Sequence, residues 1–471
     1  MKPIRYWVLF VLCLTITHCC VAQESATVIS SPENAYMVIR QVVVKGNKKT
    51  RTNVILRELG LAPGDTIRLR NLSVELEARR KQLINTSLFL NVHVNVMNWE
   101  ADYADIVVTV SERWYTFPIP IFELADRNFN QWWVEQKRSL NRVNVGVSLY
   151  QSNLTGRNDD VRAEFQIGYT QRVSLNYDLP YIDKSFRHGM GLIFSYSRNR
   201  EINDSTAGNK QHFFRKDEFL RQVYTAGLSY SYRKAIHARH QVFLTYTAEK
   251  IGDSIAILHP GYLGGGRKEI RYLNLMYRLR YSKADSWTYP LKGVLLLAEV
   301  EKMGIGPLND IDHVRLRLRV ARYWPLFHKT YGVLGLRAQT KLPADQPYLD
   351  QRAMGYQEDY LRGLEYFVVD GTSFFIVRST MKREVMNFNV HLPLVPAKFS
   401  SVPFRVMLKV YTDAGYSYSK QYGYGTLNNR FLYTGGLGLD IASFYDACLR
   451  VEYSINQLGQ KGLFLHTKLD M

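Results

Sequence analysis

The amino-acid sequence predicts a mainly β protein, in which a small α+β domain of order β-α-α-β-β precedes an antiparallel transmembrane β-barrel of sixteen strands. Three observations support this fold class. The chain has 471 residues, of which 46% are hydrophobic, and its mean hydropathy of -0.22 excludes a bundle of apolar membrane helices. It is rich in aromatic residues, with 32 tyrosines and 22 phenylalanines. The spacing of apolar residues also changes near residue 115, from mixed helical and strand periods to a period of two.

Residues 1–22 are predicted to be a secretory signal peptide and residues 23–35 a linker. Lys2 and Arg5 precede a short apolar run, and Ala22 ends a segment typical of a cleavage site. The alternative is a membrane anchor, which needs about twenty apolar residues, more than this run contains. Cleavage would leave Cys448 alone of the 4 cysteines, so we expect no internal disulfide in the exported protein. It would also lower the net charge from +19 to +17, because Lys2 and Arg5 are lost.

Residues 36–114 are predicted to form the small α+β domain. A β-branched strand ends in a glycine turn, and a short helix follows, capped by Thr50 or Thr52 and closed by Gly60. A second helix opens at Asn71 and carries leucines on one side, and two strands complete the domain. The apolar residues that give this pattern are Val42, Val43, Val44, Leu59, Leu72, Leu76, Leu83, Val92, Val94, Val96 and 106–110.

Residues 116–471 are predicted to form the barrel. Apolar residues alternate with polar or charged ones, as in the run 314–320, where arginine occupies every second position. A soluble sandwich also alternates, but only a barrel needs one face toward lipid and the other toward a polar interior. An even number of strands closes an antiparallel barrel. The sixteen predicted strands begin near Phe117, Arg142, Asp160, Arg172, Gly189, Arg221, Gln241, Glu269, Lys292, Asp312, Tyr331, Thr372, Phe404, Arg430, Asp446 and Gly462.

The connections between these strands are expected to alternate between long and short. The long ones, residues 198–219, 251–268 and 343–371, would all lie at one end of the barrel and face outward. Two connections do not fit this scheme. The turn near Gln171 is too short for its side, and residues 386–403 are too many for theirs.

Several motifs resemble those of a known superfamily. The first region resembles a POTRA (polypeptide-transport-associated) domain, and one such domain ahead of a barrel is similar to the BamA/TamA superfamily of outer-membrane assembly and translocation proteins. In the barrel, Leu361-Arg362-Gly363-Leu364 resembles the family's [VI]-R-G-[FY] loop motif. Lys382 departs from the family, which commonly has an acidic residue near this position. The other similar motifs are Val42-Val43-Val44-Lys45-Gly46-Asn47, Pro63-Gly64-Asp65, Ser87-Leu88-Phe89, Val108-Thr109-Val110-Ser111-Glu112, Asp285 to Gly293, and Val410-Tyr411-Thr412-Asp413-Ala414-Gly415.

Arg362, Gly363 and Asp413 are candidates for the anchor that holds the longest loop to the barrel wall. An arginine folded into the lumen needs a carboxylate partner, because an unpaired buried charge is costly, and Asp413 lies on a strand close by in sequence order. A bidentate pair would fix the loop, and Gly363 would allow a close approach of the backbone. The alternative is a solvated arginine on an exposed loop.

The first and last strands are candidates for a weak seam. Pro118 and Pro120 are two residues apart, so their missing N–H donors lie on the same edge of the first strand. That strand must close against the segment that contains Gly462 and Leu465, and the resemblance implies that such a seam opens sideways to pass a client strand. The alternative is that the prolines belong to a linker that leaves the POTRA domain.

The sequence therefore predicts a bacterial outer-membrane protein that assists the insertion, assembly or translocation of other outer-membrane proteins, with its POTRA domain in the periplasm as a docking module. The resemblance implies unfolded outer-membrane protein clients, contact with outer-membrane lipids, and periplasmic or lipoprotein partners at the POTRA domain. The protein is not expected to be an enzyme, and no cofactor, metal or nucleic acid is predicted to bind. The alternatives are a passive or selective channel and a barrel-anchored hydrolase.

Overall fold

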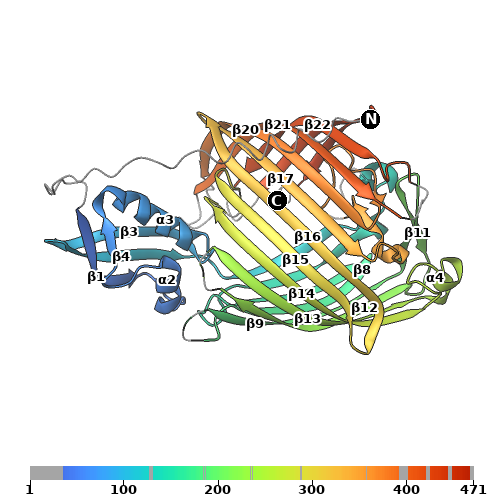
Figure 1. Ribbon diagram of the computed structural model, residues 1–471, viewed down its shortest axis with the longest axis horizontal. Coiled ribbons are helices and arrows are strands. Elements are labelled where there is room, and N and C mark those ends of the chain that lie inside the picture. The colour runs from blue at the N-terminus through green and yellow to red at the C-terminus, as the bar shows by residue number, and fades with distance from the viewer. Residues whose placement is uncertain are drawn as a thin grey trace, which may run out of the picture.

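The computed structural model describes residues 35–126, 131–183, 185, 187–233, 235, 237–286, 289–356, 358–391, 401–420, 425–443 and 448–466 (Figure 1). The predicted signal peptide and linker lie outside these residues. None of the helices in the described ranges is long and apolar enough to cross a membrane.

The amino-terminal domain is a four-stranded mixed sheet with two α-helices against it (Figure 1). Its strands pair in the order β2-β1-β4-β3, with β1 parallel to β4 and the other pairs antiparallel. The predicted order β-α-α-β-β is confirmed with one addition, the short strand β2 after the second turn. The elements are β1 (Tyr36–Lys45), α2 (Thr52–Leu59), β2 (Thr66–Arg68), α3 (Leu72–Ile84), β3 (Phe89–Glu100) and β4 (Tyr103–Glu112), with a short turn η3 (Leu69–Asn71).

The ends of helix α2 show one correct and one wrong prediction. Gly60 ends the helix in the left-handed conformation, φ 63°, and its N–H donates to the carbonyl of Leu56 at 3.0 Å. The predicted threonine cap is wrong, because Arg51 occupies the N-cap position without a side-chain cap. The hydroxyl of Thr50 instead lies 3.0 Å from the Tyr115 hydroxyl and accepts a hydrogen bond from Asn153 at 2.9 Å. Thr50 is thus used to join the domain to the barrel.

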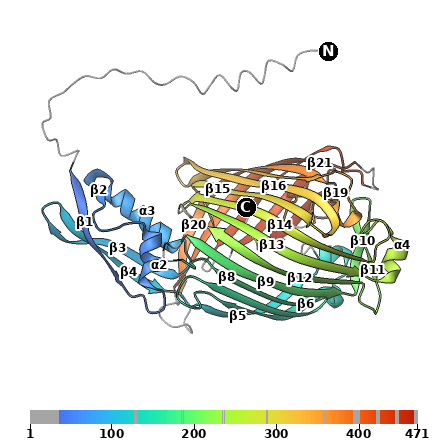
Figure 2. The ribbon, with the colours of Figure 1, turned by 60° about the horizontal axis from the view of Figure 1, so that its bottom comes forward.

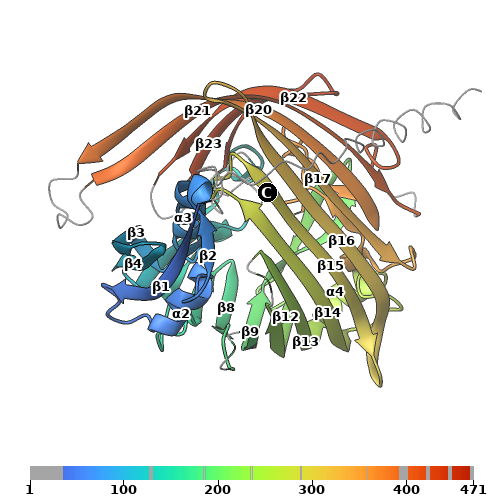
Figure 3. The same cartoon turned by 60° about the vertical axis from the view of Figure 1, so that its left-hand side comes forward.

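The second part of the chain is a sixteen-stranded antiparallel sheet that curves into a barrel (Figures 1 and 3). Each strand pairs with the next strand of the wall along the chain, and β5 and β24 stand at the two ends of the order. The number of strands is confirmed, and the observed strands begin within four residues of the predicted starts. The predicted start at Asp446 lies outside the described residues. The strands are β5 (Thr116–Leu124), β6 (Val143–Gln151), β7 (Asp160–Gly168), β8 (Thr170–Leu179), β9 (His188–Asn199), β12 (Arg221–Tyr232), β13 (Ala238–Ile251), β14 (Glu269–Ala284), β15 (Gly293–Ile305), β16 (Leu308–Phe327), β17 (Thr330–Leu342), β20 (Ser373–His391), β21 (Ser401–Tyr418), β22 (Phe431–Ala442), β23 (Cys448–Asn456) and β24 (Lys461–His466).

The two faces of each strand differ as the period of two predicts. On β21, Leu408 and Val410 expose 45% and 46% of their surface on the outside. Lys409, Tyr411 and Asp413 alternate with them, and all three are buried on the inside. Apolar side chains outside and charged side chains inside are the arrangement that a barrel in lipid requires.

The three long connections gather at the end of the barrel away from the amino-terminal domain, as predicted (Figure 1). Tyr348 of the third connection donates to Asn203 of the first at 3.0 Å, and its ring lies 5.9 Å from that of Tyr262 in the second. A shared apolar cluster with Leu220 and Ile255 holds them together. The elements of these three connections are β10 (Glu201–Ala207), β11 (Lys210–Arg215), α4 (Asp253–Leu258), η6 (Tyr348–Asp350), β18 (Arg352–Met354) and β19 (Val369–Asp370). A separate connection, from β5 to β6, contains η4 (Gln131–Glu135) and η5 (Leu140–Arg142).

The two connections that did not fit the alternation have different outcomes. The turn near Gln171 is as short as the sequence indicated: β7 ends at Gly168, with φ 107°, and β8 begins at Thr170. The span 386–403 was wrong as a connection, because β20 and β21 continue to pair as far as His391 and Ser401. The rings of Phe388 and Phe404 stack with their centres 5.7 Å apart, on the part of the two strands that extends beyond the predicted ends. The long pair β20 and β21 can be followed in Figure 3.

The amino-terminal domain contacts the turns at the other end of the barrel through a buried carboxylate (Figure 2). Glu58 of α2 is 1% exposed and forms an ion pair with Arg233, the residue after β12. Tyr181, which follows β8, donates to the same carboxylate. Burial, and then the neighbouring Glu58 charge, raise the pKa of Tyr181, so its phenol stays protonated as a donor. Arg57 adds a hydrogen bond to the carbonyl of Arg233 at 2.9 Å.

Candidate functional site: a charged anchor on the inner wall of the barrel

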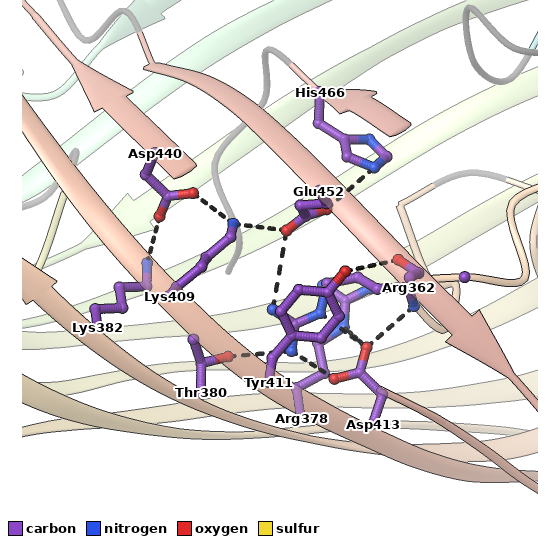
Figure 4. Close-up of polar contacts among 12 residues, drawn as sticks. Arg362, Arg378, Thr380, Lys382, Lys409, Tyr411, Asp413, Asp440, Glu452 and His466 are labelled. Carbon is purple, nitrogen blue, oxygen red and sulfur yellow. Dashed lines mark hydrogen bonds and ion pairs between the residues drawn. The ribbon is translucent and has the colours of Figure 1, made fainter. Parts of the chain in front are cut away.

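The longest connection, residues 343–372, is held to the inner wall by a fully buried arginine. Arg362 donates through Nε to Oδ2 of Asp413 at 2.9 Å and through Nη2 to Oδ1 of the same carboxylate (Figure 4). The Arg362 backbone N–H also donates to Oδ2, at 3.0 Å, and Nη2 donates to the hydroxyl of Thr380 at 3.1 Å. The structure thus brings together Arg362 and Asp413, two residues singled out in the sequence, in bidentate geometry.

Tyr411, Ser454 and Asn456 make close contacts with Arg362 and Gly363. The guanidinium carbon of Arg362 lies 3.9 Å from the centre of the Tyr411 ring, within cation–π distance. Gly363 has φ +96°, and a Cβ there would lie 2.8 Å from Cβ of Ser454. The carbonyl of Gly363 accepts a hydrogen bond from Asn456 at 2.8 Å. Glycine is therefore needed here both for its backbone conformation and for its size.

A chain of buried charges extends from the pair along the inner wall (Figure 4). Glu452 of β23 lies 4.0 Å from Arg362 and forms an ion pair of 2.6 Å with Lys409. Lys409 also pairs with Asp440 of β22, which forms a further ion pair of 3.0 Å with Lys382. Lys382, which departs from the family pattern in the sequence, is therefore paired with a carboxylate that it shares with Lys409.

The rest of the loop is tied to other strands by charged side chains. Asp359 forms ion pairs with Arg319 of β16 at 3.0 Å and with Arg337 of β17 at 3.4 Å. Burial alone would raise the pKa of Asp359. The positive charges of Arg319 and Arg337 lower it by more than burial raises it, so the pKa lies below its usual value and the carboxylate stays ionised. Asp350 pairs with Lys341 at 3.2 Å. Loop and wall are thus joined at several separate points.

Glu452, Lys409 and Asp440 were missed as site residues in the sequence. Lys409 occupies the same face of β21 as Asp413, which the period of two shows directly. The partners on β22 and β23 could not be assigned, because pairing across strands depends on register. The detectable signal was a run of charged residues at inward positions of neighbouring strands.

The residues predicted to form a seam lie on the two end strands of the sheet order. In the described part of the chain, β5 pairs with β6 alone and β24 with β23 alone. Pro118 and Pro120 lie opposite Leu149 and Val147 within β5, so they belong to the wall and not to a linker. Gly462 and Leu465 lie on β24, and the side chain of Leu465 is 40% exposed.

The fold and the anchored loop define a class of protein: a sixteen-stranded antiparallel β-barrel with one small α+β domain before it and a long loop bound to its inner wall. Residues 153–457 match the Omp85 superfamily domain, and residues 37–113 match a POTRA domain described as a surface antigen variable number repeat. The first match covers more than half of the chain. The chain belongs to the Omp85 superfamily.

Two solved structures of CdiB show the same fold at low sequence identity. CdiB from Escherichia coli has a TM-score of 0.54 and 11% identity, over 91% of this chain and 75% of that chain. CdiB from Acinetobacter baumannii has a TM-score of 0.50 and 12% identity, over 92% and 73%. BamA from Haemophilus ducreyi lacking POTRA domains 1–3 has a TM-score of 0.48 and 14% identity, over 92% and 83%. Among curated proteins, none matches this chain.

Proposed function

We propose that this protein assists the insertion, assembly or translocation of other outer-membrane proteins, and that clients pass through a seam between β5 and β24. The observation that carries the proposal is the sheet order, in which these two strands are the ends. In this proposal the POTRA domain lies in the periplasm, and the long connections face the outside of the cell. The anchored loop fills part of the lumen, which supports this function over that of an open channel.

The edge of β5 that faces away from β6 is poor in hydrogen-bond donors. The carbonyl of Tyr115 accepts from Ser152, and the N–H of Ala125 donates to Arg142, so the odd-numbered residues of this strand face β6. The register between them has no shift, so the even-numbered Pro118 and Pro120 face the edge away from β6. A strand that pairs with this edge meets two successive positions of β5 that have no N–H to donate. The seam is therefore weaker than the rest of the wall.

The edge of the POTRA sheet supports a docking role for that domain. The sheet ends on β3, a strand of 12 residues that pairs with β4 on its other side. Met97 and Trp99 on this strand are 50% and 44% exposed. An extended client chain or a lipoprotein partner can add to such an edge through backbone hydrogen bonds, which tolerate many sequences.

The test is a covalent lock on the seam. Cysteines in place of Ile119 and Leu465, in a Cys448→Ala background, would be joined across β5 and β24 with a short thiol crosslinker. The proposal predicts that the crosslinked protein stays folded in the membrane but no longer supports assembly of other barrels. Normal client assembly with a fully closed seam would overturn lateral opening.

A matched control uses two strands that already pair. Leu228 and Leu244 lie opposite each other on β12 and β13 and are 50% and 46% exposed, so cysteines there carry the same crosslinker on the outer face. Joining them should leave assembly unchanged. Equal loss of function in both crosslinked proteins would show that rigidity of the wall, and not closure of the seam, causes the defect.

A further inference from the structure

Three side chains from three separate parts of the barrel converge beside the anchor. Glu365 belongs to the long loop, Glu452 to β23 and His466 to β24. One ligand atom from each lies within 4.8 Å of the other two, and both glutamates are buried. Two carboxylates and an imidazole are a donor set that zinc and similar divalent transition metals prefer.

The distances within this cluster fit a metal better than direct hydrogen bonds. Nε2 of His466 lies 3.4 Å from Oε1 of Glu365 and 3.3 Å from Oε2 of Glu452. Charge-assisted hydrogen bonds are shorter, about 2.7–2.9 Å. Two ligands bound at about 2.0–2.2 Å to a tetrahedral zinc ion are separated by about 3.3–3.6 Å, and both distances from Nε2 of His466 lie in this range.

Each of the three ligands is oriented by a contact at its other polar atom. Oε2 of Glu365 accepts the backbone N–H of Gly363 at 2.6 Å, and Oε1 of Glu452 is paired with Lys409 at 2.6 Å. Nδ1 of His466 lies 3.2 Å from the hydroxyl of Tyr360, and the two rings stack with centres 5.4 Å apart. A histidine that donates from Nδ1 presents the lone pair of Nε2 to the cluster. Such supporting contacts are typical of metal ligands.

We propose that Glu365, Glu452 and His466 form a binding site for one divalent transition-metal ion, of which Zn²⁺ is the representative, with a water molecule as the fourth ligand. The sequence analysis expected no metal, and the site joins residues that only the folded barrel brings together. A bound ion would tie β24, a strand of six residues at the seam, to both the loop and β23. Lys409 and Arg362 beside Glu452 oppose a cation, so we expect moderate affinity.

The test measures zinc bound to the untagged full chain in detergent, after treatment with a chelator and dialysis. We expect one Zn²⁺ per chain by elemental analysis, a binding isotherm in calorimetry, and no binding of Mg²⁺, which requires six oxygen ligands. His466→Ala and Glu365→Gln should each weaken zinc binding at least tenfold. The control is His328, an exposed histidine in the turn between β16 and β17. Its replacement by alanine should leave zinc binding unchanged.

Heat-modifiable migration in gel electrophoresis would confirm that each variant is folded. Zinc should raise the temperature at which wild-type protein loses its folded band, and it should not do so for His466→Ala. If wild-type protein binds no zinc, or if it and folded His466→Ala bind zinc equally, the proposed site is wrong. If His466→Ala does not fold, Glu365→Gln and the Co²⁺ absorption spectrum of wild-type protein decide the question, because tetrahedral cobalt absorbs strongly and six-coordinate cobalt weakly.

Discussion

The ion pair between Arg362 and Asp413 gives the sharpest stability prediction. Removing one partner of a buried ion pair typically costs about 3–5 kcal/mol of stability. We expect substitution of Arg362 to cost an amount near the lower end of this range and substitution of Asp413 an amount near the upper end. In Arg362→Gln, Asp413 keeps the backbone N–H of residue 362 at 3.0 Å and Arg378 at 3.9 Å. We therefore expect a loss of about 3 kcal/mol in the free energy of unfolding. In Asp413→Asn, both guanidinium groups lose this carboxylate, and we expect a loss of about 5 kcal/mol.

The assay is equilibrium unfolding in urea of the full chain in lipid vesicles, followed by the folded band in gel electrophoresis and by proteolysis of the loop. The control is Arg383→Gln, an exposed arginine on β20, the strand that carries Arg378; its effect should stay within about 0.5 kcal/mol. Two results would refute the reasoning: both variants within the range of the control, or a larger loss for Arg362→Gln than for Asp413→Asn. The first would mean that the pair does not anchor the loop, and the second that Arg378 is not coupled to it.

Three other predictions follow from the same contacts. Glu58→Gln should weaken docking of the POTRA domain on the barrel by about 1.5–3 kcal/mol, seen as faster protease cleavage near residue 114, and unchanged cleavage would contradict this role. Hydrogen bonds from Arg40, Asn98 and Gln41 hold the pKa of Asp105 well below its usual range. The ionised Asp105 therefore contributes its full stabilisation above about pH 3.9, the pKa of an aspartate in the unfolded chain, and this contribution is lost as the pH falls below that value. The difference in unfolding free energy between wild type and Asp105→Asn should therefore shrink from pH 7 to pH 3, and a constant difference would contradict it. Deletion of residues 343–371 should raise conductance in planar bilayers, whereas little change would favour a porin-like channel.

The sequence was sufficient for the wall of the barrel because the period of two is a direct consequence of strand geometry. Leu408 and Lys409 have to face opposite sides whatever their neighbours are, so the alternation alone locates the strands. Arg362 and Asp413 were paired in the sequence analysis because a buried guanidinium requires a carboxylate and Asp413 lies on a strand close by in sequence order.

The sequence was insufficient where a contact depends on the third dimension. Thr50 was expected to cap a helix, but its hydroxyl is used between the POTRA domain and the Asn153 turn, 103 residues later. Strand β2 is only three residues long and exists because β1 offers an edge beside it. Glu365 and His466 meet through the path of a loop and the register of the last strands, neither of which a sequence pattern contains.

The most direct test of the proposed function is depletion of the protein from its own cells, followed by quantitative proteomics of the outer membrane. The account predicts that one or more other β-barrel proteins fall in abundance while inner-membrane proteins do not. Wild-type protein should restore them, and the variant crosslinked between residues 119 and 465 should not. Unchanged levels of every other barrel after depletion would contradict the assembly function.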